Sequence, residues 1–581
     1  MMKTTTFDSA STSIVDPVTV EVVHHALVTA SREMGVTLRK TSCSPMFNEG
    51  TDYSCGIFDA RNRLVSHGEF IPAHLGSLQF SVNAAVAAIG LDNLAAGDSV
   101  VLNDPYLGGS HLPDVTMVSP IFIDDKLAGF AANRAHHLDV GGTVPGSFYS
   151  QARENYQEGL RIPPVKLVSA GKRDLGMFEF ILTNCRLRDQ MRIDLESQVS
   201  ANRTAIDRVR ALHSRYGTSV VEASMDALLN YSERRVREIL AGWPDGEYSA
   251  SDFHDNDGID DIPREVCVTI RISGSSAVVD FTGSSPQTAG PMNGVLGYTH
   301  SGVRMSFQAA TDPDIPPNEG CYRPIRIIAP EGSIVNPRFP AACTGGNEAT
   351  FIVHNTVMRA LAKIPGARSM ACDQGSSNNL FISGTDPVGG KRYVLYEYPE
   401  GGWGGNQDRD GLSAVFSIVG NTWNVPVEAV ERRFPIRIER YELRCDSGGA
   451  GTHRGGLGVR RDYRVLGHQA EVSFIGNRAK IPPWGLADGG EGAVAGYFFD
   501  RGTASEAPAS PRFLSKGTMI PLGPDRVLTQ ESAGGGGWGD PRRRDVDAVM
   551  DDVLNGYVSR AAAEQLYGVV FDASGAISRV D

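Results

Sequence analysis

Residues 111–139 read HLPDVTMVSPIFIDDKLAGFAANRAHHLD, and this stretch decides the fold around it. Two apolar runs flank Asp124 and Asp125, which is typical of two antiparallel strands joined by a two-residue turn. With these aspartates at the centre of the turn, counting outward places Pro113 opposite His136. The two ends of the stretch are therefore expected to meet at the open end of a β-hairpin.

Both ends of this hairpin carry histidine and aspartate, which are residue types able to bind metals. His111 and Asp114 lie in the motif HLPD, and the returning strand ends in AHHLD, residues 135–139. Imidazole nitrogens and carboxylate oxygens without thiolates suit Zn²⁺ or Mn²⁺. Histidines beside aspartates also form purely structural hydrogen bonds, so the pattern leaves both readings open.

Two segments further upstream offer additional candidate ligands. NEGTDYS contains Glu49 and Asp52, and HGEFIPAHLGS contains Glu69 and His74. Each of these residues is equally able to cap a strand or a turn.

The remaining pattern mixes strands and helices without regular alternation. Apolar residues recur at three- and four-residue intervals from residue 18 to residue 39, which predicts an amphipathic helix. Because no βαβ repeat is present, the expected fold class is α+β, with several domains and with mixed and antiparallel sheets against packed helices. Further predicted elements are helices at 76–90, 191–217 and 346–364, the last capped at Asn347 or nearby, and a strand at 97–104.

Shifts in composition divide the chain into five expected regions. They are a flexible lead (1–16), an α+β region with the metal site (17–174), a mainly helical region (175–244), a β-rich region with an inserted helix (245–544) and a helical tail (545–581).

Composition excludes several classes of partner. The chain has 581 residues and a formal net charge of −13, so it lacks the basic surface that binds nucleic acid. The most apolar stretches, such as residues 82–91, are too short to span a bilayer, and the N-terminus lacks the apolar segment of a secretory signal. The eight cysteines form no CxxC pair. We therefore expect a cytoplasmic protein.

Glycine occurs in short islands, including EGGWGGNQ (400–407) and AGGGGWGD (533–540). Neither island has the lysine or the strand-to-helix setting of a phosphate-binding loop, and no GxxxxGK[ST] motif exists. We expect these islands to form tight turns or subunit contacts.

Several long motifs, in order along nearly the whole chain, resemble a known family. They are DYSCGIFDARNRLVSHGEFIPAHLGSL, NDPYLGGSHLPDVTMVSPIF, RAHHLDVGG, EGLRIPPVKL and ESAGGGGWGDP. They are similar to the hydantoinase B type subunit shared by ATP-dependent N-methylhydantoinases, 5-oxoprolinases, caprolactamase and the acetone and acetophenone carboxylases.

This resemblance implies a division of labour between two kinds of chain. The present chain would hold a divalent metal, Zn or Mn, through Asp52, His111, Asp114 and His137. His136 and Asp139 would then act beside the metal, fixing an imidazole tautomer or serving as general base. A hydantoinase A type partner would bind ATP and Mg, in a heterotetramer or a larger complex.

The chemistry explains why ATP is needed. A cyclic amide is a poor electrophile, and the resemblance implies that phosphorylation of the amide oxygen creates a leaving group before water attacks. Hydrolysis of a small cyclic amide is therefore the expected function. ATP-dependent carboxylation of a ketone, and a structural subunit without chemistry of its own, are the alternatives.

Overall fold

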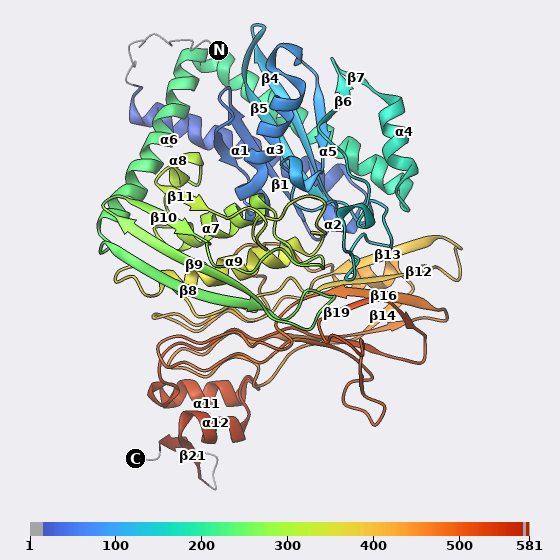
Figure 1. Cartoon of the computed structure of the whole chain (residues 1–581), viewed down its shortest axis with the longest axis vertical. Coiled ribbons are helices and arrows are strands. Elements are labelled where there is room, and N and C mark those ends of the chain that lie inside the picture. The colour runs from blue at the N-terminus through green and yellow to red at the C-terminus, as the bar shows by residue number, and fades with distance from the viewer. Residues whose placement is uncertain (1–14, 573–576, 580–581) are drawn as a thin grey trace.

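The computed structural model describes residues 15–572 and 577–579, so positions 1–14 of the predicted lead lie outside it. In Figure 1 the chain builds three layers from top to bottom. The upper layer holds the hairpin, the middle layer combines a sheet with buried helices, and the lower layer contains two further sheets and the C-terminal helices. The predicted α+β class is confirmed, whereas the region boundaries stay a prediction.

The upper layer is a seven-stranded antiparallel sheet with the order β2-β1-β5-β4-β3-β6-β7. The predicted hairpin lies at its centre, as strands β4 and β5. Its strands are β1 (Tyr53–Asp59), β2 (Leu64–His67), β3 (Ser99–Leu102), β4 (Asp114–Ile123), β5 (Lys126–His136), β6 (Val165–Ser169) and β7 (Lys172–Arg173).

The hairpin pairing differs from the count by one residue. Ile123 pairs with Lys126 as predicted, and the turn aspartates 124 and 125 have φ of 46° and 61°, as a type I′ turn requires. The register then shifts between Ile121 and Phe122, so Asp114 rather than Pro113 faces His136. The expected pairing was wrong because a bulge absorbs one residue.

Helices cover both faces of this sheet. Apolar side chains of α1 (Pro17–Thr41) and α5 (Arg188–Tyr216) pack against one face, and those of α3 (Pro72–Ile89) pack against the other. All three agree with the predicted helices. The upper layer also contains α2 (Pro45–Asn48), α4 (Leu175–Thr183), and the 3₁₀ turns η1 (Leu91–Asn93), η2 (Pro105–Leu107) and η3 (Asn155–Gln157).

The middle layer carries a four-stranded sheet, order β11-β10-β9-β8, and two buried helices. The helix α9 begins at Gly346, and Gly345 rather than Asn347 is its N-cap. Elements here are α6 (Thr218–Ala241), β8 (Gly246–His254), β9 (Arg264–Ser273), β10 (Ser276–Asp280), α7 (Leu296–Ala310), α8 (Glu319–Tyr322), β11 (Ile325–Ile328) and α9 (Gly346–Leu361).

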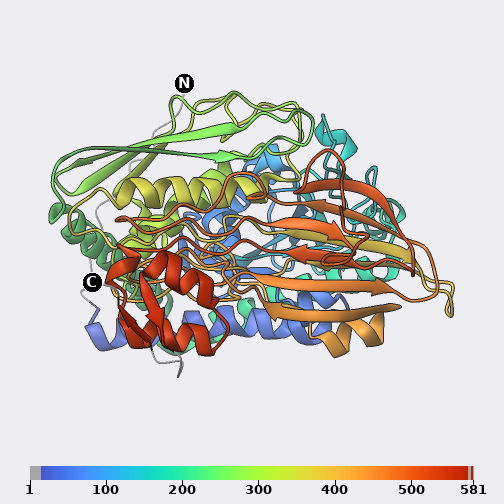
Figure 2. The same ribbon diagram turned by 90° about the horizontal axis from the view of Figure 1, so that it is seen from below.

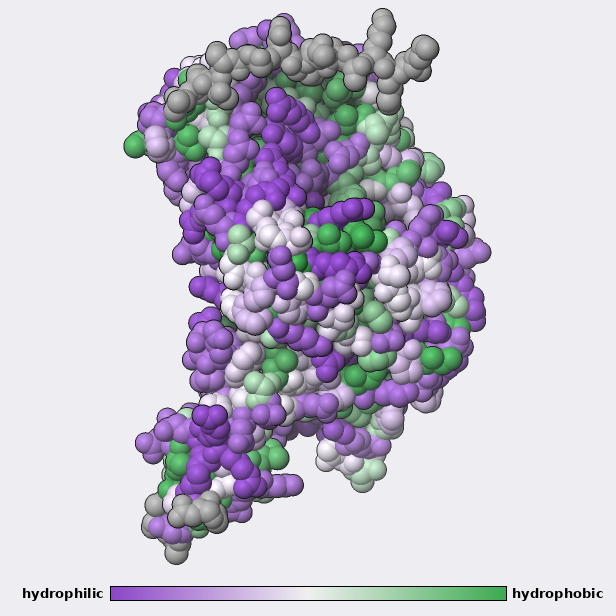
Figure 3. Space-filling view, turned by 60° about the vertical axis from the view of Figure 1, so that its left-hand side comes forward, coloured by the Kyte–Doolittle hydropathy of each residue, from purple (hydrophilic) through white to green (hydrophobic). Residues whose placement is uncertain are grey.

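The lower layer contains a sheet of order β13-β12-β16-β19 and another of order β14-β15-β20-β17-β18. The tail forms two short helices on either side of Gly556 and projects from the body in Figure 3. Elements here are β12 (Asn379–Thr385), β13 (Arg392–Glu397), α10 (Val427–Arg433), β14 (Ile436–Leu443), β15 (Val459–Val465), β16 (Ala470–Ile475), β17 (Gly496–Phe499), β18 (Ala507–Pro508), β19 (Lys516–Leu522), β20 (Leu528–Glu531), η4 (Pro541–Arg543), α11 (Val546–Leu554), α12 (Arg560–Tyr567), β21 (Val569–Phe571) and β22 (Ile577–Arg579).

Most of the island glycines lie in close backbone packing, whereas the expected subunit contacts stay a prediction. Four glycine-rich segments, here called the glycine lattice, bond to one another through their backbones. They are residues 401–405, 448–458, 485–492 and 534–537, and Figure 2 shows extended chains running side by side in this layer. Gly405 N donates to Gly536 O (2.9 Å), and Gly535 N donates to Gly456 O (2.9 Å). A Cβ on Gly535 would lie 2.0 Å from the carbonyl oxygen of Trp403. The expectation of tight turns was wrong for most of these glycines, because they serve close backbone packing; Gly539, with φ of 76°, is an exception.

One apolar core joins the layers. It includes Leu27 of α1, Ile57 of β1, Val268 of β9, Val353 of α9 and Phe381 of β12, all buried. Hydrophilic residues dominate the face seen in Figure 3. None of the described helices combines the length and apolarity needed to cross a bilayer.

Candidate metal centre

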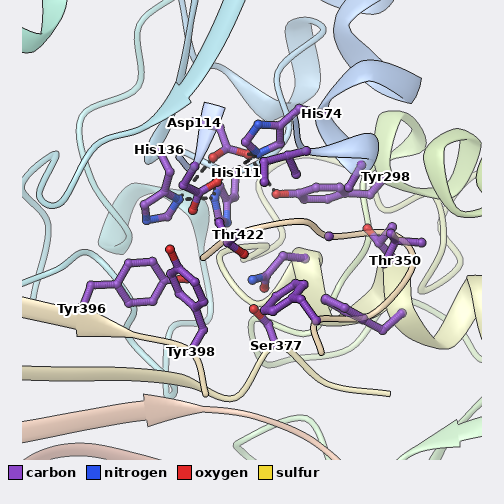
Figure 4. A pocket seen from close by; sticks show the side chains of 18 residues that line it. His74, His111, Asp114, His136, Tyr298, Thr350, Ser377, Tyr396, Tyr398 and Thr422 are labelled. Carbon is purple, nitrogen blue, oxygen red and sulfur yellow. Dashed lines mark hydrogen bonds and ion pairs between the residues drawn. The ribbon is translucent and has the colours of Figure 1, made fainter. Parts of the chain in front are cut away.

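The open end of the β4–β5 hairpin brings three buried side chains together (Figure 4). Asp114 begins β4, His136 ends β5, and His111 lies in the turn just before β4. His111 Nε2 lies 2.9 Å from Asp114 Oδ1 and 3.1 Å from His136 Nδ1, and His136 Nδ1 lies 3.2 Å from the same oxygen. We call these three residues the His/Asp cluster.

A backbone contact fixes the tautomer of His111. Its Nδ1 donates to the carbonyl oxygen of Thr344 at 3.1 Å, which directs Nε2 at the cluster. Glu158 holds that segment in place, because its carboxylate accepts from the backbone N–H groups of Cys343 (2.9 Å) and Thr344 (2.7 Å). Glu158 belongs to the EGLRIPPVKL motif, and it acts on the cluster through Thr344.

The donor set fits a divalent cation. A lone pair on His111 Nε2 and the carboxylate oxygen of Asp114 repel each other at 2.9 Å unless a proton or a cation lies between them. The separations of 2.9–3.2 Å are near the distance of about 3.3 Å between tetrahedral ligands that each lie about 2.0–2.1 Å from zinc. Nitrogen and carboxylate donors of this kind suit Zn²⁺ or Mn²⁺.

Asp114 is held as a carboxylate. Burial by itself would raise its pKa, but His111 and His74 lower the pKa well below its usual range. Its second oxygen, Oδ2, accepts from Ser110 Oγ (2.6 Å) and Tyr298 Oη (3.1 Å). Burial lowers the pKa of His136 to about 4, so this ring is neutral and able to ligate.

His74 and Asp52 extend the cluster. His74 Nε2 lies 3.3 Å from Asp114 Oδ2 and 4.0 Å from an oxygen of Asp52. His74 Nδ1 is buried without a hydrogen-bond partner among the described residues. Burial and the charge of Asp114 raise the pKa of Asp52 well above its usual range. Both residues line the same cavity as the cluster.

The other upstream carboxylates lie apart from the cluster. Glu49 pairs with Arg433 at 3.5 Å, and Glu69 pairs with Arg32 at 2.5 Å near the surface. The structure therefore brings Asp52 and His74 to the site and leaves the two glutamates in ion pairs.

His137 is not brought into the cluster. Consecutive residues of an extended strand point to opposite faces, so His136 and His137 diverge. The Nε2 of His137 donates to Oε1 of Gln198 in α5 at 2.9 Å, and its ring packs edge-on against Phe47. His136, for which the sequence analysis expected a role beside the metal, therefore belongs to the cluster in place of His137.

Asp139 also lies outside the cavity lining, and its carboxylate is fully used. Its oxygens accept from the backbone of Gly141 (3.0 Å) and Gly146 (3.1 Å) and from the backbone and guanidinium of Arg186 (2.9 and 3.1 Å). These bonds organise the loop after β5, which contains the two glycines.

A small cavity adjoins the His/Asp cluster. The space open to the centres of water-sized groups has a volume of about 50 Å³. Tyr396 lies flat against His136, with ring centroids 5.0 Å apart. The cluster occupies one side, and residues of α7, α9, β13 and neighbouring loops close the others; among them are Tyr298, Thr350, Phe351, Ser377, Tyr396, Tyr398, Phe416 and Val419.

Sequence reasoning missed these cavity residues. Tyr396 and Tyr398 lie two positions apart at the end of a strand, so period-two alternation predicts that they share a face. No local pattern indicates which face meets the hairpin, because the contact joins positions more than 250 residues apart in the chain.

Comparisons with known proteins agree with this architecture. Residues 16–541 match the family described as hydantoinase B/oxoprolinase. The beta chain of the caprolactamase of Pseudomonas jessenii is 33% identical over 567 residues, 97% of each chain. The B chain of a putative D-/L-hydantoinase of Pseudomonas sp. (strain NS671) is 32% identical over 96% of this chain and 95% of that one.

Solved structures show the same fold. The crystal structure of ATP-dependent caprolactamase from Pseudomonas jessenii superimposes with a TM-score of 0.89 at 32% identity, covering 97% of this chain and 98% of that chain. A nucleotide-free acetone carboxylase structure gives a TM-score of 0.85 at 19% identity over 97% and 81% of the two chains, which is a likeness of fold alone. The chain belongs to the hydantoinase B/oxoprolinase family.

Proposed function

We propose that this chain is the metal-binding β subunit of an ATP-dependent cyclic amide hydrolase. A hydantoinase A type subunit would bind ATP and Mg and phosphorylate the amide, within a cytoplasmic heterotetramer or a larger complex. The buried His/Asp cluster carries this proposal, because its two imidazoles and its carboxylate are spaced like ligands around one cation. Similarity to the caprolactamase and hydantoinase chains supports the reaction class.

His111, Asp114 and His136 would hold the metal, Zn or Mn, and Asp52 would supply a further carboxylate. The buried Asp52 has a raised pKa, and a nearby cation favours its ionised form. A bound divalent metal would supply a water of lowered pKa and would polarise the amide carbon.

His74 would move the proton of the attacking water. Its Nε2 faces Asp114, which orients the ring, and its Nδ1 carries no other partner among the described residues. A base whose second nitrogen is held by a carboxylate is the usual arrangement for accepting a proton during hydrolysis. Tyr396 and the apolar wall around Phe416 would keep bulk water from the activated amide.

Sequence identity supports amide hydrolysis over ketone carboxylation. The chain is 33% identical to the caprolactamase beta chain but 19% identical to the acetone carboxylase chain. The second likeness concerns the fold alone, and no described residue of the cavity specifically favours carboxylation.

The test is reconstitution with an ATP-binding partner subunit. The complex is expected to open cyclic amides at the expense of ATP without bicarbonate, and elemental analysis is expected to find about one Zn or Mn per chain. ATP consumption that requires bicarbonate and a ketone would support the carboxylase. A chain without stoichiometric metal, and without effect on the partner, would support the structural role.

A further inference from the structure

Two buried hydroxyl groups in the cavity wall have no hydrogen-bond partner among the described residues. They belong to Tyr398, 2% exposed, and Thr350, 1% exposed. In Figure 4 Tyr398 points toward the His/Asp cluster, whereas Thr350 lies further along the cavity. A buried hydroxyl without a partner is costly, so each is suited to bind a polar atom of a ligand.

Thr350 departs from the usual behaviour of a helical threonine. Such a hydroxyl commonly bonds to the carbonyl oxygen four residues earlier in the helix. Thr356, on the same helix α9, does so with Ile352 at 2.6 Å. The hydroxyl of Thr350 has no such bond, and it lines the cavity instead.

The charge of the cavity is one-sided. Asp52 and Asp114 lie on the cluster side, and no Lys or Arg occurs among the described residues that line the cavity. The part around Thr350 contains the neutral Ser377 and the apolar Phe351. A ligand carboxylate there would be buried without a cationic partner, which is strongly unfavourable.

We propose that Tyr398 and Thr350 determine substrate specificity, and that the cavity selects small uncharged rings with two polar edges. Tyr398 hydrogen-bonds to the amide that faces the cluster. Thr350 hydrogen-bonds to a second carbonyl or N–H on the far edge of the ring. Rings that carry a carboxylate are excluded. This inference rests on the proposed function, because it assumes that the cavity beside the cluster receives the cyclic amide.

Three five-membered rings separate these contributions. 2-Pyrrolidinone has one amide, succinimide adds a second carbonyl at the same ring size, and 5-oxoproline adds a carboxylate to 2-pyrrolidinone. Their dissociation constants are measured by calorimetry with the full-length chain supplied with Zn²⁺. Succinimide is expected to bind about fivefold more tightly than 2-pyrrolidinone, the effect of about one hydrogen bond, and 5-oxoproline at least about tenfold more weakly.

Variants then assign the hydroxyls. Thr350→Val is expected to remove the advantage of succinimide and to leave 2-pyrrolidinone within about twofold. Tyr398→Phe is expected to weaken both rings about fivefold. Thr356→Val and Tyr393→Phe are matched controls, because their hydroxyls bond to Ile352 and His468 instead of lining the cavity. Both controls are expected to leave all three constants unchanged.

The inference would be overturned if Thr350→Val weakened the binding of succinimide and 2-pyrrolidinone equally. It would also be overturned if 5-oxoproline bound as tightly as 2-pyrrolidinone, or if none of the rings bound. Ring opening by the reconstituted complex is scored separately. Turnover without this discrimination among the three rings would contradict the inference and would leave the proposed function unaffected. Discrimination among the rings without ATP-dependent turnover would contradict the proposed function alone.

Discussion

The hairpin end and the glycine lattice are opposite solutions to burying polar groups. At the hairpin end, the polar atoms belong to side chains, and Asp114 satisfies its second oxygen through Ser110 and Tyr298. In the lattice, the polar atoms belong to the backbone. Gly405 N donates to Gly536 O, and a Cβ on either glycine would lie within 2.5 Å of the backbone oxygen of another residue. The structure of the hairpin end depends on the identity of its side chains, whereas the structure of the glycine lattice depends on the absence of side chains.

The two regions meet at the cavity. Tyr398 lies three residues before Gly401, where the chain enters the lattice, and Gln374 N donates to Gly402 O at 2.8 Å near the segment that carries Ser377. The lattice is therefore a rigid base for one wall of the cavity. The hairpin supplies the opposite wall.

Gly535→Ala is the strongest test of the lattice. The added Cβ would lie 2.0 Å from a backbone oxygen of Trp403, and backbone hydrogen bonds on several sides prevent a simple shift. We expect a loss of more than about 3 kcal/mol of unfolding free energy, or no folded protein, measured as the denaturation midpoint. Gly176→Ala, at an exposed position in α4, is the control and is expected to be neutral or stabilising. Equal midpoints for both variants would contradict close backbone packing.

His136→Ala and His137→Ala test the hairpin end as a matched pair. His136 belongs to the cluster, whereas His137 bonds to Gln198. We expect His136→Ala to weaken metal binding about a hundredfold or more, because loss of even an outer partner costs about 10–100-fold. His137→Ala is expected to retain metal while losing stability. Metal titration followed by elemental analysis decides between them, and loss of metal only in His137→Ala would reverse the assignment.

Glu158→Gln tests how the Thr344 segment supports the hairpin end. Burial raises the pKa of Glu158 to about 7 from an ordinary value of 4.5, so its contribution to stability is complete below about 4.5 and is lost as the pH rises through 7. We expect wild-type stability to fall over this window by on the order of 2–3 kcal/mol from this group. In Glu158→Gln this fall is expected to disappear, with a loss of about 1–3 kcal/mol at about pH 5 from the disturbed hydrogen bonds. An unchanged pH profile in denaturation experiments would contradict the raised pKa.

Asp125→Gly is expected to have the smallest effect and the opposite sign to the lattice variant. Asp125 has φ of 61° in the type I′ turn, where glycine is preferred at this position. We expect a gain of about 0.5–1 kcal/mol, measured as a higher denaturation midpoint. A loss of stability would show that the aspartate side chain matters more than the backbone conformation.

Local patterns in the sequence predicted much of the upper layer. The helix α1, the turn at residues 124–125 and the meeting of HLPD with AHHLD all follow from periodicity and turn chemistry, which act over a few residues. The predicted register of the hairpin was wrong by one residue because of the bulge. A shift of one residue is enough to replace the side chain at a given position by its neighbour, which points to the other face. The family resemblance implied His137 as the ligand, whereas the observed register places His136 opposite Asp114.

By itself, the sequence determined that a β-hairpin carries histidine and aspartate at its open end, because short-range backbone preferences and alternation depend on neighbouring residues. Only the tertiary structure decided which of these side chains converge. It also brought His74, Tyr398 and Thr350 to one cavity and buried the glycine islands as a lattice. The physical reason is that such contacts join segments far apart in the chain, where packing of whole layers sets the geometry and no local pattern records it.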